Sequence, residues 1–411
     1  MGRLLDVIAP PRLGRGFRWL LASSWTSNLG DGIALAAGPL LVASQTDSPI
    51  LVALAAMLQR LPWLLFGLWA GAVADRVDRR LLVVVADVLR ALVVAVLCLA
   101  VATGWVDVTV VLVTSFLYGV AEVFADTASS TLLPMLVERE DLGIGNARLQ
   151  AGFLTTNQLV GPPLGAFLFA VGSVWPFVVQ ALCVALAALL VARVATPPGA
   201  VRNLEGTHVR RDIADGLRWI AGHAAVRTLA LVILAFNVTW GAAWSVLVLY
   251  SLDRLGMGEV GFGLLTTAAA VGGLVSTSAY TTIERNVPLA TIMRVCLLLE
   301  VLTHLALALT TTGWVAIGVM VVFGAYAFVW GTVSQAVRQR AVPREFQGRV
   351  GSVYVVGLFL GLVVGQALGG MLADRWGLTA PFWFAFVGSG LTLAVVWRSL
   401  GLIAHADERG T

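Results

Sequence analysis

The sequence predicts an all-helical integral membrane protein with twelve transmembrane helices, arranged as two six-helix halves. Three observations lead to this fold class: the composition, the placement of the arginines, and short repeats separated by half the chain. Of the 411 residues, 59% are hydrophobic and 12% are charged, against roughly a quarter charged in soluble domains. Since a transmembrane helix needs ~20 mainly apolar residues, the composition is sufficient for about twelve of them.

The predicted helices are twelve apolar runs, each bounded by polar or Gly/Pro-containing breaks. They cover residues 19–43, 50–73, 81–103, 108–131, 149–171, 174–194, 228–250, 259–282, 288–310, 315–337, 350–372 and 379–400. Four arginines in residues 1–18 precede the first run. This run is longer than the apolar core of a signal peptide and is followed by many further apolar runs, so we expect an uncleaved first span.

The arginines orient these helices, because loops that stay in the cytoplasm retain positive charge. With the N-terminus inside, the inner segments hold 22 of the 27 arginines, the outer loops two and the spans three. The sequence therefore predicts a multi-pass protein of the bacterial inner membrane with both termini in the cytoplasm. Arginines distributed in this way do not form one basic face, so we expect no nucleic-acid partner.

The longest polar interruption divides the chain near its midpoint. It contains Ile213, Leu217 and Ile220 on one helical face, a pattern typical of a short amphipathic helix at the membrane surface. The predicted domains are an N-terminal half (1–194), a cytoplasmic linker (195–227) and a C-terminal half (228–411).

Short repeats indicate that the two halves arose by duplication. In order, the repeated pairs are Thr103-Gly104-Trp105-Val106 with Thr312-Gly313-Trp314-Val315, Val137-Glu138-Arg139-Glu140 with Val342-Pro343-Arg344-Glu345, and Gly161-Pro162-Pro163-Leu164-Gly165 with Gly365-Gln366-Ala367-Leu368-Gly369. The separations are 209, 205 and 204 residues, each close to half the chain. A parallel duplication of a six-helix unit is typical of transporters whose halves rock about a site at the midplane.

The basic residues and the thiols exclude several kinds of chemistry. All 27 basic residues are arginines, so the chain has neither a Walker A lysine nor a Schiff-base lysine. The four histidines and three cysteines are scattered through separate segments, without the spacing of a metal site or a disulfide framework. We expect no enzymatic activity, no metal and no cofactor, and a proton gradient as the source of energy.

A charged motif stands at the inner end of the second run: Gly71-Ala72-Val73-Ala74-Asp75-Arg76-Val77-Asp78-Arg79-Arg80. Gly71 permits close approach of another helix, and the charged residues are expected to form a gate network at the cytoplasmic mouth. The motif resembles G-x-x-x-D-R-x-G-R-[RK] of the major facilitator superfamily, with Asp78 at the second glycine. The D-R-x-D-R-R form is similar to that of the drug:proton antiporter branch, which includes macrolide efflux and enterobactin exporters. We expect Asp87 and Arg90, in the third run, to complete this network.

The fifth run carries Asn157-Gln158-Leu159-Val160-Gly161-Pro162-Pro163-Leu164-Gly165. It resembles the superfamily's antiporter motif g-x-x-x-G-P-x-x-G, with Asn157 at the first glycine. Pro162 removes a backbone hydrogen bond, while Gly161 and Gly165 permit tight contact with a neighbouring helix. The resemblance implies export. A kinked packing helix with no influence on direction is the alternative.

Charged residues within spans are functional candidates, because burying a charge in hydrocarbon is costly. Asp31, Arg60 and Glu122 lie about 15–20 Å from the outer ends of their runs at ~1.5 Å per residue, and hence in one layer. In the resembled fold the first and fourth helices line the cavity, so Asp31 and Glu122 can be reached from it. A carboxylate there that exchanges its ion pair with Arg60 for a proton is a suitable coupling site. The alternative is a static buried ion pair.

Polar and aromatic residues at mid-depth are candidates for the wall of a substrate cavity. They are Asn28, Asn237, Trp240, Trp244, Tyr326 and Trp330. Such a wall with one or two acids suits an amphipathic, often cationic, organic molecule; side chains that merely pack between helices are the alternative. Glu300 and His304 form a further polar pair one turn apart. The ninth helix is peripheral in the resembled fold, so a helix–helix hydrogen bond is favoured there.

These features predict a secondary transporter that exports a small organic compound, such as a drug, a siderophore or another secondary metabolite, in exchange for protons. We expect alternating access between two states, a monomer, and membrane lipid around it. A proton-coupled uptake symporter and a lipid or lysophospholipid flippase on the same fold remain as alternatives.

Overall fold

The computed structural model describes residues 10–195, 209–343 and 346–400, and every regular element within them is a helix. The first elements are η1 (Pro11–Leu13), α2 (Gly14–Gln45), α3 (Pro49–Ala74), α4 (Arg79–Ala102), α5 (Val108–Ser130), α6 (Leu133–Leu136), η2 (Arg139–Asp141), α7 (Leu142–Gly152), η3 (Phe153–Val160), α8 (Gly161–Val171) and α9 (Trp175–Val191). They are followed by α10 (Val209–Gly222), α11 (Ala224–Ser245), α12 (Leu247–Leu249), η4 (Tyr250–Arg254), α13 (Gly258–Asn286), α14 (Leu289–Leu309), α15 (Gly313–Ala341), α16 (Gln347–Trp376) and α17 (Ala380–Val396).

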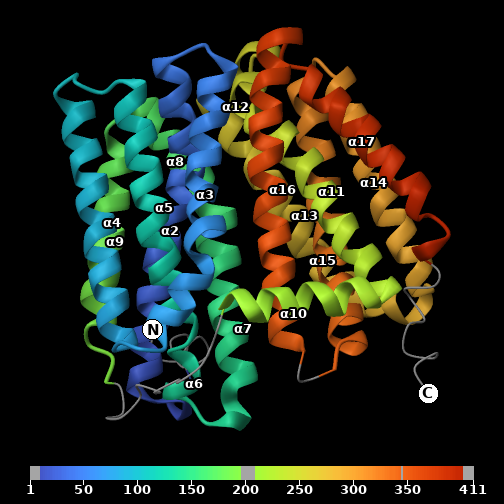
Figure 1. Ribbon diagram of the computed structural model, residues 1–411. Helices are drawn as coiled ribbons and strands as arrows, with labels where there is room; N and C mark the ends of the chain where they lie inside the picture. The colour runs from blue at the N-terminus through green and yellow to red at the C-terminus, as the bar shows by residue number, and fades with distance from the viewer. Residues whose placement is uncertain (1–9, 196–208, 344–345, 401–411) are drawn as a thin grey trace. The chain divides into compact units, whose positions relative to one another are not determined.

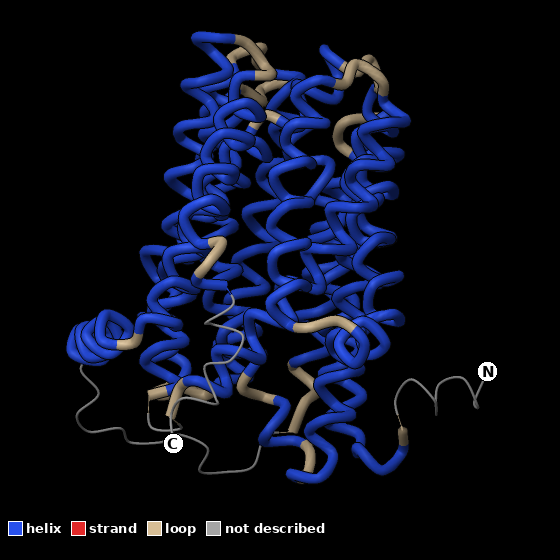
Figure 2. The backbone as a smooth tube through the Cα atoms, turned by 90° about the vertical axis from the view of Figure 1, so that its right-hand side faces the viewer, coloured by secondary structure: helices blue, strands red, loops and turns tan. Residues whose placement is uncertain are grey.

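Each of the twelve predicted runs overlaps one or more of these helices. Eight helices in the described ranges are long and apolar enough to cross a membrane. The fifth run is divided among α7, the π-helix η3 and α8, and α9 and α17 are 17 residues long. Serine, threonine, asparagine and aspartate side chains lower the hydropathy of α2. Figure 2 shows that the loops lie mainly at the helix ends.

The chain forms two compact units (Figure 1). Residues 1–46 and 61–206 make up the first, and residues 47–60 and 207–411 make up the second, which therefore includes the start of α3. In the first unit α2 packs against α8 and α9, and α4 packs against α5 and α9. In the second, α11 packs against α16 and α17, α13 against α15, and α14 against α15 and α17.

The repeated glycine segments make equivalent contacts in the two units. A Cβ atom built on Gly165 would meet the carbonyl oxygen of Ile33 in α2, and one built on Gly365 would meet that of Val238 in α11. Both segments thus bring two helix backbones together at positions where a side chain would not fit. The contact of α8 with α2 has its counterpart in the contact of α16 with α11.

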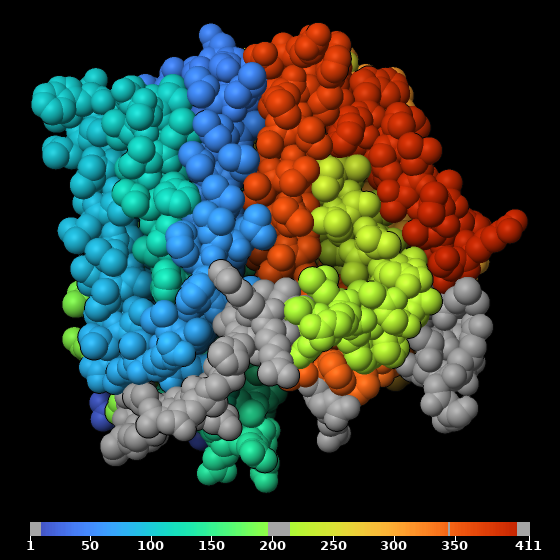
Figure 3. All heavy atoms as spheres, in the orientation of Figure 1, coloured from blue at the N-terminus to red at the C-terminus, as the bar shows by residue number. Residues whose placement is uncertain are grey.

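The amphipathic helix predicted in the linker is present as α10. Figures 1 and 3 show it lying across the long helices of the second unit, and it packs against α16. Gly216 permits this contact, because a Cβ atom there would lie 2.7 Å from the carbonyl oxygen of Arg349. Ile220 is buried in the core of the second unit, whereas Leu217 is 52% exposed. The side chain of Ile213 lies outside the described residues.

Candidate functional site

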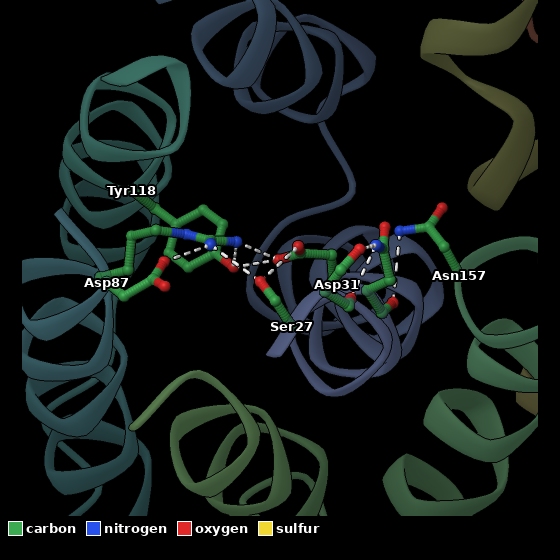
Figure 4. A network of polar contacts seen from close by, with 8 residues as sticks. Ser27, Asp31, Asp87, Tyr118 and Asn157 are labelled. Carbon is green, nitrogen blue, oxygen red and sulfur yellow. Dashed lines mark hydrogen bonds and ion pairs between the residues drawn. The ribbon is translucent and has the colours of Figure 1, made fainter. Parts of the chain in front are cut away.

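A buried polar cluster joins α2, α4 and α5 in the first unit (Figure 4). At its centre is Arg90 on α4, whose side chain is 1% exposed. Its Nη1 donates to Asp87 Oδ1 at 2.9 Å and to Ser27 Oγ at 3.1 Å. Its Nη2 donates to the carboxylate of Asp31 and, at 2.6 Å, to the hydroxyl oxygen of Tyr118. One guanidinium therefore serves two carboxylates on different helices.

Tyr118 supports the same arrangement in two ways. Its hydroxyl donates to Asp31 Oδ1, and its ring centroid lies 4.8 Å from the guanidinium carbon of Arg90, within cation–π range. Ser27, one turn before Asp31 on α2, donates to Asp31 Oδ2 at 3.4 Å. The Asp31 side chain is 15% exposed, against 4% for Asp87. Asp31 is therefore the carboxylate of the pair that is more accessible to water.

Acidic groups outnumber the arginine in this cluster. Glu122 on α5, one turn after Tyr118, also acts electrostatically on Arg90. Asp126 follows one turn later and is exposed. Because Asp31 and Asp87 both bond directly to the guanidinium, loss of one of these contacts would leave the other in place.

One predicted grouping differs in the structure. Within the first unit Arg90 pairs with Asp31, so Arg90 and Asp87 belong to the cluster around Asp31 and not to the cytoplasmic motif. The reason is distance along α4, since eleven residues separate Arg79 from Arg90, or ~16 Å at 1.5 Å per residue. The third helix therefore carries its buried charges to the depth at which Asp31 lies.

The charged motif ties the ends of three helices together. Asp75 and Arg79 form an ion pair at 3.0 Å, and Arg79 Nε also donates to the carbonyl of Ala74 at 3.3 Å. Asp78 caps α4 by accepting a hydrogen bond from the backbone N–H of Leu81 at 3.0 Å. Arg80 donates a hydrogen bond to the backbone carbonyl of Ala192, directly after the last residue of α9. Two further motif residues take no part in these contacts. Arg76 is exposed. No atom of the first unit lies within 4 Å of a Cβ atom built on Gly71.

The antiporter-like motif packs directly against the helix that carries Asp31. A Cβ atom on Gly161 would lie 2.5 Å from the Cα of Gly32, so α8 and α2 touch one residue from the carboxylate. Pro162 is buried at the start of α8, directly after the π-helix η3. π-Helical turns are frequent at functional sites.

Asn157 lies in η3, on the side of α2 away from Tyr118 and Asp87 (Figure 4). Its Nδ2 donates to the backbone carbonyl of Asn28 at 3.3 Å. The side chain of Asn28 donates to the Ser24 carbonyl at 2.7 Å, so this predicted cavity residue is engaged within its own helix. The sequence motif that contains Asn157 does not predict this contact with α2.

Several predicted cavity residues converge in the second unit. A cavity of about 170 Å³ opens among α11, α14 and α15. Its walls are Ile233, Phe236, Asn237, Trp240, Cys296, Leu297, Glu300, Phe323, Tyr326, Ala327 and Trp330. Trp244 lies outside this set and packs against Trp240 with ring centroids 4.5 Å apart. The structure thus joins predicted aromatic residues to Glu300, which the sequence analysis placed in a separate pair.

Glu300 holds a small hydrogen-bonded network between α14 and α15. His304 Nε2 lies 3.1 Å from Glu300 Oε1, and the hydroxyl of Tyr326 donates to Glu300 Oε2 at 2.7 Å. The same hydroxyl lies 3.2 Å from Thr303 Oγ1. Glu300 therefore makes a hydrogen bond between helices and also borders the cavity. Among the described residues, no group of three or more potential ligands is arranged to hold a metal ion.

Comparison with known proteins gives one family and several relatives. A family model described as transmembrane secretion effector matches residues 7–405. The multidrug efflux pump Tap of Mycolicibacterium fortuitum is 28% identical over 399 residues, which are 94% of each chain. Macrolide efflux protein A of Streptococcus pyogenes is 22% identical over 381 residues, which cover 88% of this chain and 90% of the relative.

Solved structures share the fold. A bacterial homologue of the iron transporter ferroportin, in an inward-facing state, superposes with a TM-score of 0.76 at 17% identity, over 94% of this chain and 98% of that one. A bacterial homologue of the lysosomal transporter Spinster gives a TM-score of 0.71 at 12% identity, over 98% of both chains. At these identities the similarity shows the helical architecture alone.

Proposed function

Because the chain belongs to the transmembrane secretion effector family of the major facilitator superfamily, a family of multi-pass membrane transporters, we propose that it exports a small organic compound from the bacterial cell in exchange for protons. The relatives named as multidrug and macrolide efflux pumps support the direction and the kind of substrate. The resemblance seen in the sequence motifs is confirmed by the match to the family.

The observation that carries the proton exchange is the arginine shared by two carboxylates. When Asp31 takes up a proton, its ion pair with Arg90 is lost while the pair with Asp87, at 2.9 Å, remains. The guanidinium is never left without a counter-ion, which would be strongly unfavourable in a buried site. One proton therefore weakens the link of α2 to α4 and α5 without disrupting α4 itself.

A change at Asp31 acts on a helix that is rigidly held on its other side. Gly161 and Gly165 fix α8 against Gly32 and Ile33 of α2, so α2 and α8 move as one body. Protonation and substrate binding then change the relative free energies of an inward-open and an outward-open state. The ion pair of Asp75 with Arg79 stabilises the closed cytoplasmic gate in this scheme.

The topology belongs to the same proposal. We propose twelve spans, with two six-helix halves (1–194 and 228–411) joined by a cytoplasmic linker and both termini in the cytoplasm. The protein works as a monomer surrounded by lipid, without a cofactor. The proton gradient supplies the energy.

The proposal is tested with purified protein in vesicles that contain a pH-sensitive dye and carry an imposed proton gradient. Erythromycin and ethidium serve as probes. We expect wild-type protein to move protons when a probe is added, the Asp31→Asn variant to lose this exchange, and Asp47→Asn, at an exposed aspartate, to keep it. Proton-coupled flux in Asp31→Asn at the wild-type rate would contradict the coupling role.

Two outcomes separate the alternatives. Accumulation of the probe in cells that overproduce the protein would replace export by uptake. Movement of a fluorescent lipid that is insensitive to the gradient, with no movement of either probe, would replace it by a flippase.

A further inference from the structure

Glu300 is a buried carboxylate without a permanent cation beside it. The residue is 7% exposed, and among the described residues its ion-pair partner is His304, which is charged only when protonated. The Nδ1 atom of His304 is buried and has no hydrogen-bond partner in the described part of the chain. Because a buried carboxylate is costly without a counter-ion, this site gains stability from any cation that reaches it.

The cavity beside Glu300 offers such a cation an aromatic wall. Trp240 stacks on Phe323 with ring centroids 4.1 Å apart and an interplanar angle of 8°. Phe323 in turn meets Tyr326 edge to face, with centroids 5.6 Å apart, and Trp330 also lines the cavity. Indole and phenyl faces attract organic cations. Since the rings hold one another in place, the wall is formed before a ligand arrives.

The size of the cavity limits what enters it. Its volume is about 170 Å³, whereas pockets that enclose a whole drug-sized molecule measure roughly 300–1,000 Å³. It therefore fits a substituted ammonium head group, with the rest of a larger molecule outside. Asn237 donates its Nδ2 to the Ile233 carbonyl at 2.7 Å, which fixes the amide at the cavity wall.

The first unit shows what the second one lacks. Tyr326 stands 208 positions after Tyr118, a separation within the range of the sequence repeats. Each tyrosine donates its hydroxyl to a carboxylate, Tyr118 to Asp31 and Tyr326 to Glu300. In the first unit Arg90 supplies the cation for that carboxylate. In the second unit the carboxylate lies on α14, the helix that the repeat pairs with α4, and a cavity opens beside it. The ammonium group of a ligand in that cavity would serve as its cation.

We propose that this cavity binds the ammonium head of an organic amine, with Glu300 as its counter-ion and Trp240 and Trp330 as its cation–π partners. The inference rests on the proposed export function and names the class of compound exported: amphipathic amines whose charged head is compact. Binding takes place within the second unit and uses neither Asp31 nor Arg90.

Equilibrium dialysis of the purified full-length protein tests the site directly. The probe is radiolabelled benzyltrimethylammonium, and the competitors are its unlabelled form and neopentylbenzene, which has the same shape without the charge. We expect saturable binding that the unlabelled cation displaces and the neutral isostere does not. Displacement by both to the same extent would overturn the proposal, because charge would then play no part.

Variants locate the binding. Glu300→Gln keeps the hydrogen-bond acceptor but removes the charge, and we expect it to raise the Kd about tenfold or more. Trp330→Leu should raise the Kd several-fold through loss of the ring face. The matched controls are Glu259→Gln and Trp314→Leu, at exposed positions of the same unit, and both should bind as wild type. An unchanged Kd in either Glu300→Gln or Trp330→Leu would overturn the proposal, and the second variant serves if the first does not fold.

Failure of this site is distinguishable from failure of the export function. If the wild type binds the cation selectively but vesicles show no outward flux of any probe, the site stands and the export proposal falls. If Glu300→Gln binds the cation as wild type does and exports erythromycin normally, the export proposal stands and the site falls.

Discussion

Arg90 makes contacts that another cation would not reproduce. Its two terminal nitrogens reach Asp31 and Asp87 on different helices, and its flat guanidinium lies over the ring of Tyr118. Lysine carries the same charge as a single ammonium and lacks the planar fork that serves two carboxylates at once. At the scale of the residue, the shape of the cation is therefore as important as its charge.

We expect Arg90→Lys to fold and to lose most of the proton-coupled transport, by about tenfold or more, because one carboxylate is left with a weaker partner. Arg90→Ala should destabilise the protein by roughly 3–5 kcal/mol, since it leaves buried carboxylates uncompensated. Thermal unfolding in detergent and flux in vesicles measure the two effects. Arg139→Lys, at an exposed arginine, is the control, and equal flux in both lysine variants would contradict the role of Arg90.

The two aspartates of the cluster should respond differently to neutralisation. Asp31 is the more exposed and bonds across helices, whereas Asp87 pairs with Arg90 on its own helix at i,i+3. We expect Asp31→Asn to keep substrate binding and lose proton exchange, and Asp87→Asn to lower mainly the yield of folded protein. Probe binding and proton flux on the same preparations distinguish these outcomes. Uncoupling by Asp87→Asn alone would reverse the assignment.

The cluster's membership could have been found from the sequence. Arg90 lies 13 residues from the outer end of its predicted span and Asp31 lies 12, or ~20 and ~18 Å at 1.5 Å per residue. The depth comparison that selected Asp31, Arg60 and Glu122 therefore applies equally to Arg90. The position of Asp87 and Arg90 towards the cytoplasmic end of their span suggested the gate network instead.

Individual elements are positioned by glycine where two backbones meet. Gly161 and Gly165 hold α8 against α2, and Gly361 and Gly365 hold α16 against α11, in each case where a Cβ atom would overlap the partner's atoms. Small residues permit such approach when the surrounding lipid gives no hydrophobic drive for association. The glycine motif thus has a packing role, whatever its influence on transport direction.

Substitution of these glycines tests the element contacts. We expect Gly161→Ala, with its Cβ 2.5 Å from the Gly32 Cα, to lower the unfolding free energy by roughly 1–3 kcal/mol and to reduce flux. Gly365→Ala should do the same at the repeated contact. Gly38→Ala on α2, where no atom lies within 4 Å of the added carbon, should be neutral. Equal melting temperatures for all three variants would refute the proposed contact.

The ion pair between Asp75 and Arg79 should affect kinetics more than stability. Its members are 37% and 18% exposed, and exposed pairs contribute about 0–1 kcal/mol. We expect Asp75→Asn to unfold at nearly the wild-type temperature but to transport several-fold more slowly, because one gating contact is lost. Glu259→Gln, at an exposed acidic residue, is the control. A wild-type rate for Asp75→Asn would exclude the gating role.

On the scale of the whole molecule, the two units carry related but unequal polar networks. A tyrosine bonds to a carboxylate in each, but the first unit neutralises that carboxylate with Arg90 and the second leaves a cavity beside Glu300. In the proposed mechanism, one unit handles the proton and the other the ligand's charge.

Cysteine accessibility tests the topology of the whole chain. In a variant without Cys98, Cys183 and Cys296, Trp105→Cys should react with an impermeant thiol reagent from outside the cell, and Arg139→Cys only from the inside. The excess of arginine in the predicted inner segments is the physical reason. Reaction of both residues from the same side would contradict the twelve-span arrangement.

Properties that depend on composition and spacing could be predicted from the amino-acid sequence. Apolar run lengths predicted the helices, arginine counts predicted an orientation, and motifs identified the superfamily, because each of these is written along a single segment of chain. The cytoplasmic motif and α10 were recognisable in the same way, since their residues are neighbours in sequence. Half-chain repeats likewise indicated two related six-helix halves.

Which side chains meet depends on how the helices pack together. Asp31 and Arg90 are 59 residues apart, and Trp240, Glu300 and Tyr326 come from three helices. Their contacts depend on how each helix is rotated and tilted against its neighbours. Because a membrane helix is apolar on all its faces, its sequence does not show which face contacts which neighbour. That is why the sequence located the buried charges by depth, while only the assembled helices showed Arg90 as their shared partner and Glu300 as the acid of an aromatic cavity.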